Sequence, residues 1–247
     1  MASISAFGRG RWRGLTALAL VPWGVLSAQA GAPDSRATVA IMYFTNSALV
    51  RHEEYEPLSK GITEMLITEL AASPAIQVVE RDRLQKLLEE QDLTSAGRVD
   101  KETAARLGKI LGARHMLMGG FVIDPKQNMR LDLRAVNVET SRVEYVETVS
   151  GKAENVLGLI ASLGTKVNGR LRLPPLPTAR PTGGKTSKSN QLRAVILLSR
   201  ALNEEDRGNI PGAIALYREA LGVYPEYDRA RVLLASLESP GKAQPLQ

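Results

Sequence analysis

The chain has 247 residues, with 32 lysines and arginines against 26 aspartates and glutamates, no cysteine and two histidines. A chain of this length forms one or two domains of ordinary size. Because cysteine is absent, disulfide scaffolds, cysteine-based zinc and iron–sulfur sites, thiol nucleophiles and cysteine-linked lipid anchors are excluded. The scarcity of histidine leaves little for imidazole catalysis, so the composition points away from an enzyme.

The first thirty residues have the pattern of a secretory signal peptide. Arginines at positions 9, 11 and 13 precede an apolar run from Leu15 to Leu26 and the small residues Ala28 and Ala30. We expect cleavage after Ala30 and a location in the periplasm, without a lipid anchor. The apolar run is shorter than a membrane span and is interrupted by a proline and a glycine, so an uncleaved membrane anchor is the less favoured alternative.

Removal of residues 1–30 takes away three arginines and no acidic residue, so the formal charge falls from +6 to +3. Both tryptophans, Trp12 and Trp23, leave with this segment. The remaining lysines and arginines are interspersed with acidic residues and form no basic stripe with stacking aromatics. We therefore expect no nucleic-acid partner, no small-molecule substrate and no cofactor.

Residues 37–172 predict an α/β (α+β) domain with a mixed β-sheet of about five strands flanked by helices. The run from Thr38 to Phe44 is continuously apolar, as in a strand that is buried on both faces. The elements follow the order β-α-β-α-α-β-β-β-α, so we expect the first two strands to be parallel neighbours or near neighbours. The expected strands cover residues 38–44, 76–79, 115–123, 130–138 and 142–149, and the expected helices begin at Pro57, Asp82, Asp100 and Ala153.

Capping residues and glycines add local expectations. Asp82 and Asp100 each precede an apolar helical stripe and are expected to be N-caps, and Gly112 is expected to end the helix that Asp100 begins. Ile110 belongs to the stripe of that helix and is expected to be buried. The glycine pair at 119–120 lies inside a strand, which indicates a bulge or a close backbone approach from a helix.

The composition changes over residues 173–190, which contain four prolines followed by glycines, lysines and serines. Such a stretch buries too little apolar surface to order itself and is expected to be a linker. Residues 191–238 show three helical patterns and no strand pattern, which predicts a small all-α unit.

A series of short stretches runs through residues 37–172. They are Val39-Ala40-Ile41 with Phe44, Val78-Val79-Glu80-Arg81 with Leu84, Leu87-Leu88 and Glu90-Gln91, Ala104-Ala105, Leu107-Gly108, Leu111-Gly112-Ala113, Leu117-Met118-Gly119-Gly120, and Leu133-Arg134-Ala135-Val136-Asn137-Val138 with Thr140. Taken together, in this order and spacing, they resemble the CsgG-type domain of curli production assembly/transport components and of several periplasmic envelope proteins.

The resemblance implies an accessory role in envelope assembly or in secretion of surface fibres or polymers, by docking of partner proteins. The chain differs from the channel-forming members, because it has no cysteine to lipidate and because short polar turns join its strands. Those members contribute long hairpins to a membrane barrel, and a membrane strand needs about 9–11 residues, for which there is no room here. The chain therefore resembles the pore-less periplasmic members, and a self-sufficient secretion pore is not expected.

Small residues recur in the all-α unit at regular spacing. Ala213, Tyr217, Ala220 and Pro225 match the second helix of a tetratricopeptide repeat (TPR), and Ala201 matches the small-residue position of the first helix. The unit thus resembles one such repeat followed by an extra helix. Because helical repeats need about three units to stand alone, we expect this unit to pack on another surface or to self-associate.

No catalytic, metal-binding or cofactor-binding residues are assigned. The stretch from Gly183 to Thr186 imitates a phosphate-binding loop but lacks the preceding strand and the following helix. His52 and the two glutamates after it are interpreted as a solvated loop, and His115 as a half-buried structural residue. Glu80 and Arg81 are interpreted as a helix cap and surface pair, with a partner contact as the alternative.

We expect a non-enzymatic accessory protein that binds envelope proteins, with homo-oligomer formation left open. The expected contact surfaces are the loop after the first strand, with Asn46 and Tyr55, and the all-α unit near Tyr217, Tyr224 and Tyr227, since tyrosines are favoured interface anchors. Packing inside the unit is the alternative for these tyrosines, for Tyr217 more than for Tyr227. Two other functions stay open: regulation of a periplasmic envelope enzyme of the cell-wall synthase type, and a subunit of a ring-shaped secretion assembly.

Overall fold

The computed structural model describes residues 36–93, 99–172 and 186–239. The predicted signal peptide with Ala28 and Ala30, and most of the predicted linker, lie outside the described residues. All described residues belong to one compact unit that begins at Arg36.

The strands are β1 (Ala37–Ile41), β2 (Thr45–Asn46), β3 (Ile76–Val78), β4 (His115–Ile123), β5 (Asn128–Asn137) and β6 (Val143–Lys152). The helices are α1 (His52–Tyr55), α2 (Leu58–Ala71), α3 (Arg81–Glu90), α4 (Lys101–Leu111), the 3₁₀ turn η1 (Ala153–Asn155), α5 (Val156–Arg170), α6 (Lys188–Asp206), α7 (Ile210–Val223) and α8 (Asp228–Glu238).

The strands form one mixed sheet in the order β3-β1-β4-β5-β6, and the short β2 also pairs with β4. β1 is parallel to both β3 and β4, whereas β4, β5 and β6 form an antiparallel meander. This architecture confirms the predicted fold class. It also confirms that the first two expected strands, which are β1 and β3, are parallel neighbours. The meander follows from the short turns at residues 124–127 and 138–142, which reverse the chain between strands.

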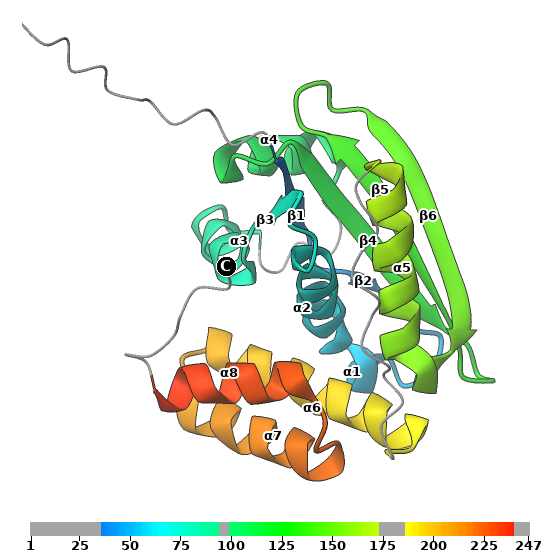
Figure 1. Cartoon of the computed structure of the whole chain (residues 1–247), viewed down its shortest axis with the longest axis vertical. Coiled ribbons are helices and arrows are strands. Elements are labelled where there is room, and N and C mark those ends of the chain that lie inside the picture. The colour runs from blue at the N-terminus through cyan, green and yellow to red at the C-terminus, as the bar shows by residue number, and fades with distance from the viewer. Residues whose placement is uncertain (1–35, 94–98, 173–185, 240–247) are drawn as a thin grey trace, which may run out of the picture. The chain divides into compact units, whose positions relative to one another are not determined.

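Helices cover both faces of the sheet at β1, which explains why β1 is apolar throughout (Figure 1). Val39 and Ile41 point into the cluster that α2 and α5 share, while Ala40 joins the cluster of α3 and α4 on the opposite face. Successive side chains of a strand alternate between faces, so a strand between two helical layers needs apolar residues at every position.

Of the expected helix ends and buried positions, some are confirmed and others are wrong. Asp100 accepts a hydrogen bond from the Thr103 backbone N–H at 2.7 Å, and Gly112 has a left-handed φ of 69°, so both predicted helix ends are confirmed. The predicted cap at Asp82 is wrong, because α3 begins one residue earlier and Asp82 lies in its first turn. Ile110 is also corrected: its side chain is 55% exposed on the outer side of α4.

The glycines at 119 and 120 permit a close approach, but not from a helix. A Cβ at Gly119 would lie 2.5 Å from the Phe44 ring, and one at Gly120 would lie 3.2 Å from the Thr45 carbonyl oxygen. Both contacts come from the segment that leads into β2. The glycines therefore let this segment lie directly on β4, where the β2–β4 pairing forms.

Of the three C-terminal helices, α6 packs on α2, α7 packs on α6 and α8 packs on α7, and together they extend the same apolar core (Figure 1). Gly61 of α2 makes this possible, since a Cβ there would lie 1.8 Å from the Ser199 hydroxyl oxygen of α6. The phenol of Tyr227 lies 3.1 Å from the Met65 sulfur. The helical unit was expected to pack on another surface, and α2 of the same chain provides one. The assignment of these helices to the TPR family stays a prediction.

None of the helices in the ranges described is long and apolar enough to cross a membrane.

Candidate functional site

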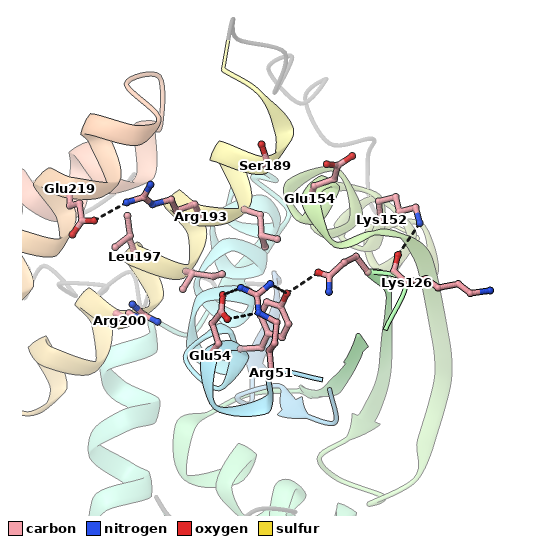
Figure 2. A pocket seen from close by; sticks show the side chains of 14 residues that line it. Arg51, Glu54, Lys126, Lys152, Glu154, Ser189, Arg193, Leu197, Arg200 and Glu219 are labelled. Atoms are coloured by element: carbon pink, nitrogen blue, oxygen red, sulfur yellow. Dashed lines mark hydrogen bonds and ion pairs between the residues drawn. The ribbon is translucent and has the colours of Figure 1, made fainter. Parts of the chain in front are cut away.

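A groove of about 670 Å³ opens between α6 and the end of the sheet where the β4–β5 turn lies (Figure 2). One wall is the outer side of α6, with Glu219 of α7 beside it. The other wall combines α1, the β4–β5 turn and the junction between β6 and η1. We call this feature the α6 groove. It exists only because the C-terminal helices pack on the sheet domain, so both parts of the chain contribute to it.

The α1 wall is fixed by hydrogen bonds between segments far apart in the sequence. The Tyr55 hydroxyl donates to Gln127 Oε1 at 2.9 Å, which ties α1 to the β4–β5 turn. Arg51 donates to Glu54 through Nε and lies over the Tyr55 ring, with its guanidinium carbon 5.5 Å from the ring centroid. Lys152 donates to the Lys126 carbonyl at 3.1 Å and steadies the rim (Figure 2).

The α6 wall has an apolar floor and a charged border. Ile196 and Leu197 are 8% and 5% exposed and form part of the floor with Leu192. Arg193 and Arg200 lie on the exposed side of the same helix. Over the whole groove, five lysines and arginines face three glutamates, so the border carries an excess of positive charge.

A second group of charges holds the groove's two parts together. Lys60 and Glu64 of α2, Arg81 of α3, Asp206 of α6 and Arg229 of α8 form what we call the junction cluster. Arg81 Nη1 lies 2.6 Å from Asp206 Oδ1, and Arg229 Nε donates to Glu64 Oε1 at 2.7 Å. The side chains of Glu64 and Arg81 are only 2% and 4% exposed. Buried charges require such pairing, because unpaired ones are costly away from water.

Burial and neighbouring charges shift several pKa values in and beside the junction cluster. Burial alone would lower the pKa of Arg81, but the Asp206 carboxylate, together with Tyr43 and Asp82, more than compensates and raises it. Burial, followed by the nearby Glu205 carboxylate, raises the pKa of the Tyr217 phenol. Burial also raises the pKa of Glu205 itself, against the opposing hydrogen bond that Tyr217 donates to it at 2.8 Å. The hydrogen bond between Tyr217 and Glu205 thus holds α7 against α6.

Arg81 corrects the interpretation of Glu80 and Arg81 as a surface pair. Glu80 is exposed and is the N-cap residue of α3, as expected, although its side chain makes no capping bond; Arg81 is buried and joins α3 to α2 and to the distant α6. The contact is internal to the chain. A buried arginine in a short amphipathic helix cannot be foreseen without knowing which carboxylates come to meet it.

The residues expected to contact partners lie mostly inside the molecule. Tyr55, Tyr217, Tyr224 and Tyr227 are 1%, 0%, 5% and 3% exposed, so in this structure their rings pack internally. Internal packing is the alternative that was stated for Tyr217. Tyr55 lines the α6 groove through its edge, and the half-buried Asn46 uses its amide to bind the His52 carbonyl and Glu56.

The histidines have structural surroundings. His115 is more buried than expected, with 8% exposed, and its Nδ1 lies 2.8 Å from Glu144 Oε2. His52 is exposed, but it begins the short helix α1 rather than lying in a loop. No three acidic or histidine side chains gather to hold a metal ion in the part of the chain that the structure describes. Most of the glycine–lysine stretch before Thr186 lies outside that part.

Sequence reasoning missed the α6 groove and the junction cluster. Three signals were present. Two of them are Gly61 in the middle of an apolar helix and Glu64 on the same helix next to buried positions. A third is the row Arg193, Arg200 and Arg207, which recurs every seven residues. Such residues in a helix indicate a close helix–helix contact, a buried ion pair and a charged stripe respectively.

Comparison with known families supports the resemblance over part of the chain. The family model described as curli production assembly/transport component CsgG matches residues 25–123. The match covers the chain from before β1 to the end of β4, which is 99 of 247 residues. It confirms the resemblance over this range. No curated protein matches the sequence.

Several solved structures are similar at low identity. The C-terminal domain of LpoB from Salmonella enterica is 14% identical with a TM-score of 0.38, over 48% of this chain and 84% of that one. Lipoprotein GNA1162 from Neisseria meningitidis is 14% identical with a TM-score of 0.39, over 54% and 95%. The PelC dodecamer from Paraburkholderia phytofirmans is 13% identical with a TM-score of 0.35, over 57% and 90%. Similarity at this level establishes neither a shared fold nor a shared role.

Proposed function

We propose that this protein is a non-enzymatic accessory protein of the bacterial envelope, located in the periplasm, that docks partner proteins during envelope assembly or secretion of surface fibres or polymers. The CsgG-family match over residues 25–123 supports the envelope context. The signal-peptide pattern of residues 1–30 supports export.

The α6 groove is the observation that carries the docking role. Its apolar floor is bordered by exposed charged side chains, the arrangement by which protein interfaces combine affinity with orientation. One wall combines α1, which lies in the family-matched part, with segments that follow it in the chain, and the other wall comes from the C-terminal helices; both are fixed by hydrogen bonds or ion pairs. A pre-formed surface of this kind binds a partner without a large ordering cost.

Site-specific crosslinking in cells tests the docking role. A photoreactive amino acid replaces Arg193 or Arg200 on the groove wall, and, as a matched control, Arg134, which is exposed on β5. We expect crosslinks to one or a few periplasmic or outer-membrane proteins from the groove positions and not from position 134. Equal labelling from all three positions, or none from the groove, would contradict the proposal.

The nature of the captured protein separates this function from regulation of an envelope enzyme. A fibre or polymer secretion component supports the main proposal. A cell-wall synthase supports the regulatory alternative, and adding this protein to the purified synthase is then expected to change its rate.

The edge of the sheet favours a second candidate, a subunit of a ring-shaped assembly. In the described part of the chain, β6 pairs only with β5, so backbone groups along its outer edge are open to another strand. Lys166 covers part of this edge by donating to the Thr148 carbonyl at 2.9 Å. Mass measurement of the purified chain decides this point: a closed oligomer supports the ring, and a monomer or dimer excludes it.

A further inference from the structure

A row of arginines runs the length of α6. Arg193, Arg200 and Arg207 follow one another at intervals of seven residues, which is two helical turns, or about 10.5 Å along the helix axis. All three are exposed. Arg193 lies 3.5 Å from Glu219 and Arg207 lies 2.9 Å from Glu204, whereas Arg200 makes no ion pair with any described carboxylate.

The hollow beside this row is longer than the α6 groove alone. A second hollow of about 410 Å³ continues past Pro57 to Asn209 and Leu216, and Arg200 lines both. Together they follow α6 from Ser189 to Arg207, a length of about 27 Å at 1.5 Å per residue. Apolar side chains lie along this path at Leu192, Leu197 and Leu216. The surface is therefore an extended strip that is apolar in the middle and cationic along its side.

From this juxtaposition we infer that the α6 groove binds an acidic amphipathic peptide segment of a partner protein, with aliphatic side chains on the floor and carboxylates along the arginine row. This inference rests on the proposed docking function and adds the chemical class of the partner. Arginine guanidinium groups bind carboxylates in paired hydrogen bonds, which fixes the register of an acidic segment. The length of the strip accommodates about 18 residues of helix or about 8 residues of extended chain.

The charges favour this occupant over a polyanion such as nucleic acid. Four glutamates line the two hollows among the six lysines and arginines, so a uniformly negative ligand meets repulsion at several points. An acidic peptide places its carboxylates opposite arginines and its aliphatic groups on the floor. Arg200, which pairs with none of the carboxylates that the structure describes, is the position where a new ion pair forms without breaking one of theirs.

Peptide binding to the purified full chain tests this inference. The probes are a fluorescein-labelled peptide of about 18 residues with leucines at helical spacing and glutamates elsewhere, a version with lysines in place of the glutamates, and a scrambled version. Fluorescence anisotropy is measured at about 50 mM and about 300 mM NaCl. We expect binding of the acidic amphipathic peptide only, about tenfold weaker in Arg200→Glu and unchanged in the control Arg134→Glu, with weaker binding at the higher salt.

Three results would overturn the inference: equal binding of all three peptides, equal affinity of Arg200→Glu and Arg134→Glu, or concentration-dependent dimerisation that Arg200→Glu abolishes, which would make a second copy the occupant. Circular dichroism of both variants establishes that they fold. The in-cell crosslinks distinguish failure of the acidic-peptide inference from failure of the docking function. If groove positions crosslink to a partner while the acidic peptide does not bind, the function stands and the partner chemistry is wrong.

Discussion

The junction cluster makes a quantitative prediction through Arg81→Met. Methionine preserves much of the volume and apolar stem of the side chain but removes the guanidinium that lies between Glu64 and Asp206. Loss of one partner from a buried ion pair costs about 3–5 kcal/mol, because the other charge stays buried. Arg229 still pairs with Glu64 and Lys60 still pairs with Asp206, so we expect the lower end, about 3 kcal/mol.

Urea denaturation of the full chain measures this loss, with Arg83→Met as the control on the exposed side of the same helix. Hydrogen exchange of the same variant shows which elements lose stability. We expect faster exchange in α8, which depends on the cluster, and little change at β4, which pairs with two long strands. A change below about 0.5 kcal/mol in Arg81→Met, or a loss equal to that of Arg83→Met, would refute the reasoning, since surface substitutions have effects of that size.

Three further substitutions test other parts of the account. Gly61→Ala is expected to destabilise by about 1–3 kcal/mol in urea denaturation, because the new methyl group collides with Ser199 and forces α6 away from α2; unchanged stability would mean that the helices are not in close contact. Gly112→Ala is expected to cost about 1 kcal/mol from its left-handed φ of 69° alone, since nothing lies near the added methyl group, and hydrogen exchange is expected to show the effect at the end of α4 and not in α6. Glu205→Gln removes a carboxyl group whose pKa is raised by burial. The protonated form of such a group stabilises the folded chain below the ordinary glutamate pKa of about 4.3, and this stabilisation is lost as the pH rises and the buried carboxyl ionises. The variant is therefore expected to be more stable than the natural chain at about pH 7 and to lose this advantage at about pH 4; a constant difference at both values would contradict the role of burial.

Periodicity predicted the sheet domain well because its signals are local. A strand buried on both faces is apolar at every position, as residues 38–44 are, and the meander strands are separated by short polar turns. Asp100 and Gly112 are confirmed as helix ends because capping depends on one residue and its immediate neighbours. Asp82 was misplaced because the helix begins with Arg81, which is buried by its pairing with Asp206, a residue distant in the sequence.

The candidate site could not be predicted for the same physical reason. The α6 groove requires that α6 lie beside the β4–β5 turn, and this depends on Gly61, Tyr227 and the junction cluster acting together. Tyrosine content alone suggested a contact surface near Tyr217 and Tyr227, but aromatic rings are equally suited to fill the space between packed helices. The exposed arginines of α6 are ordinary in sequence, and only the packing gives them a shared hollow.

The most direct test of the account measures whether the two walls of the α6 groove keep a fixed separation in solution. The chain contains no cysteine, so Lys126→Cys and Ser189→Cys introduce unique sites for spin labels on the β4–β5 turn and on α6. Pulsed electron–electron double resonance measures the distance between the two labels. We expect a single narrow distance distribution, which becomes broader when Arg81→Met is added. A broad distribution in the otherwise natural chain would show that the helices move independently of the sheet and that no permanent groove exists.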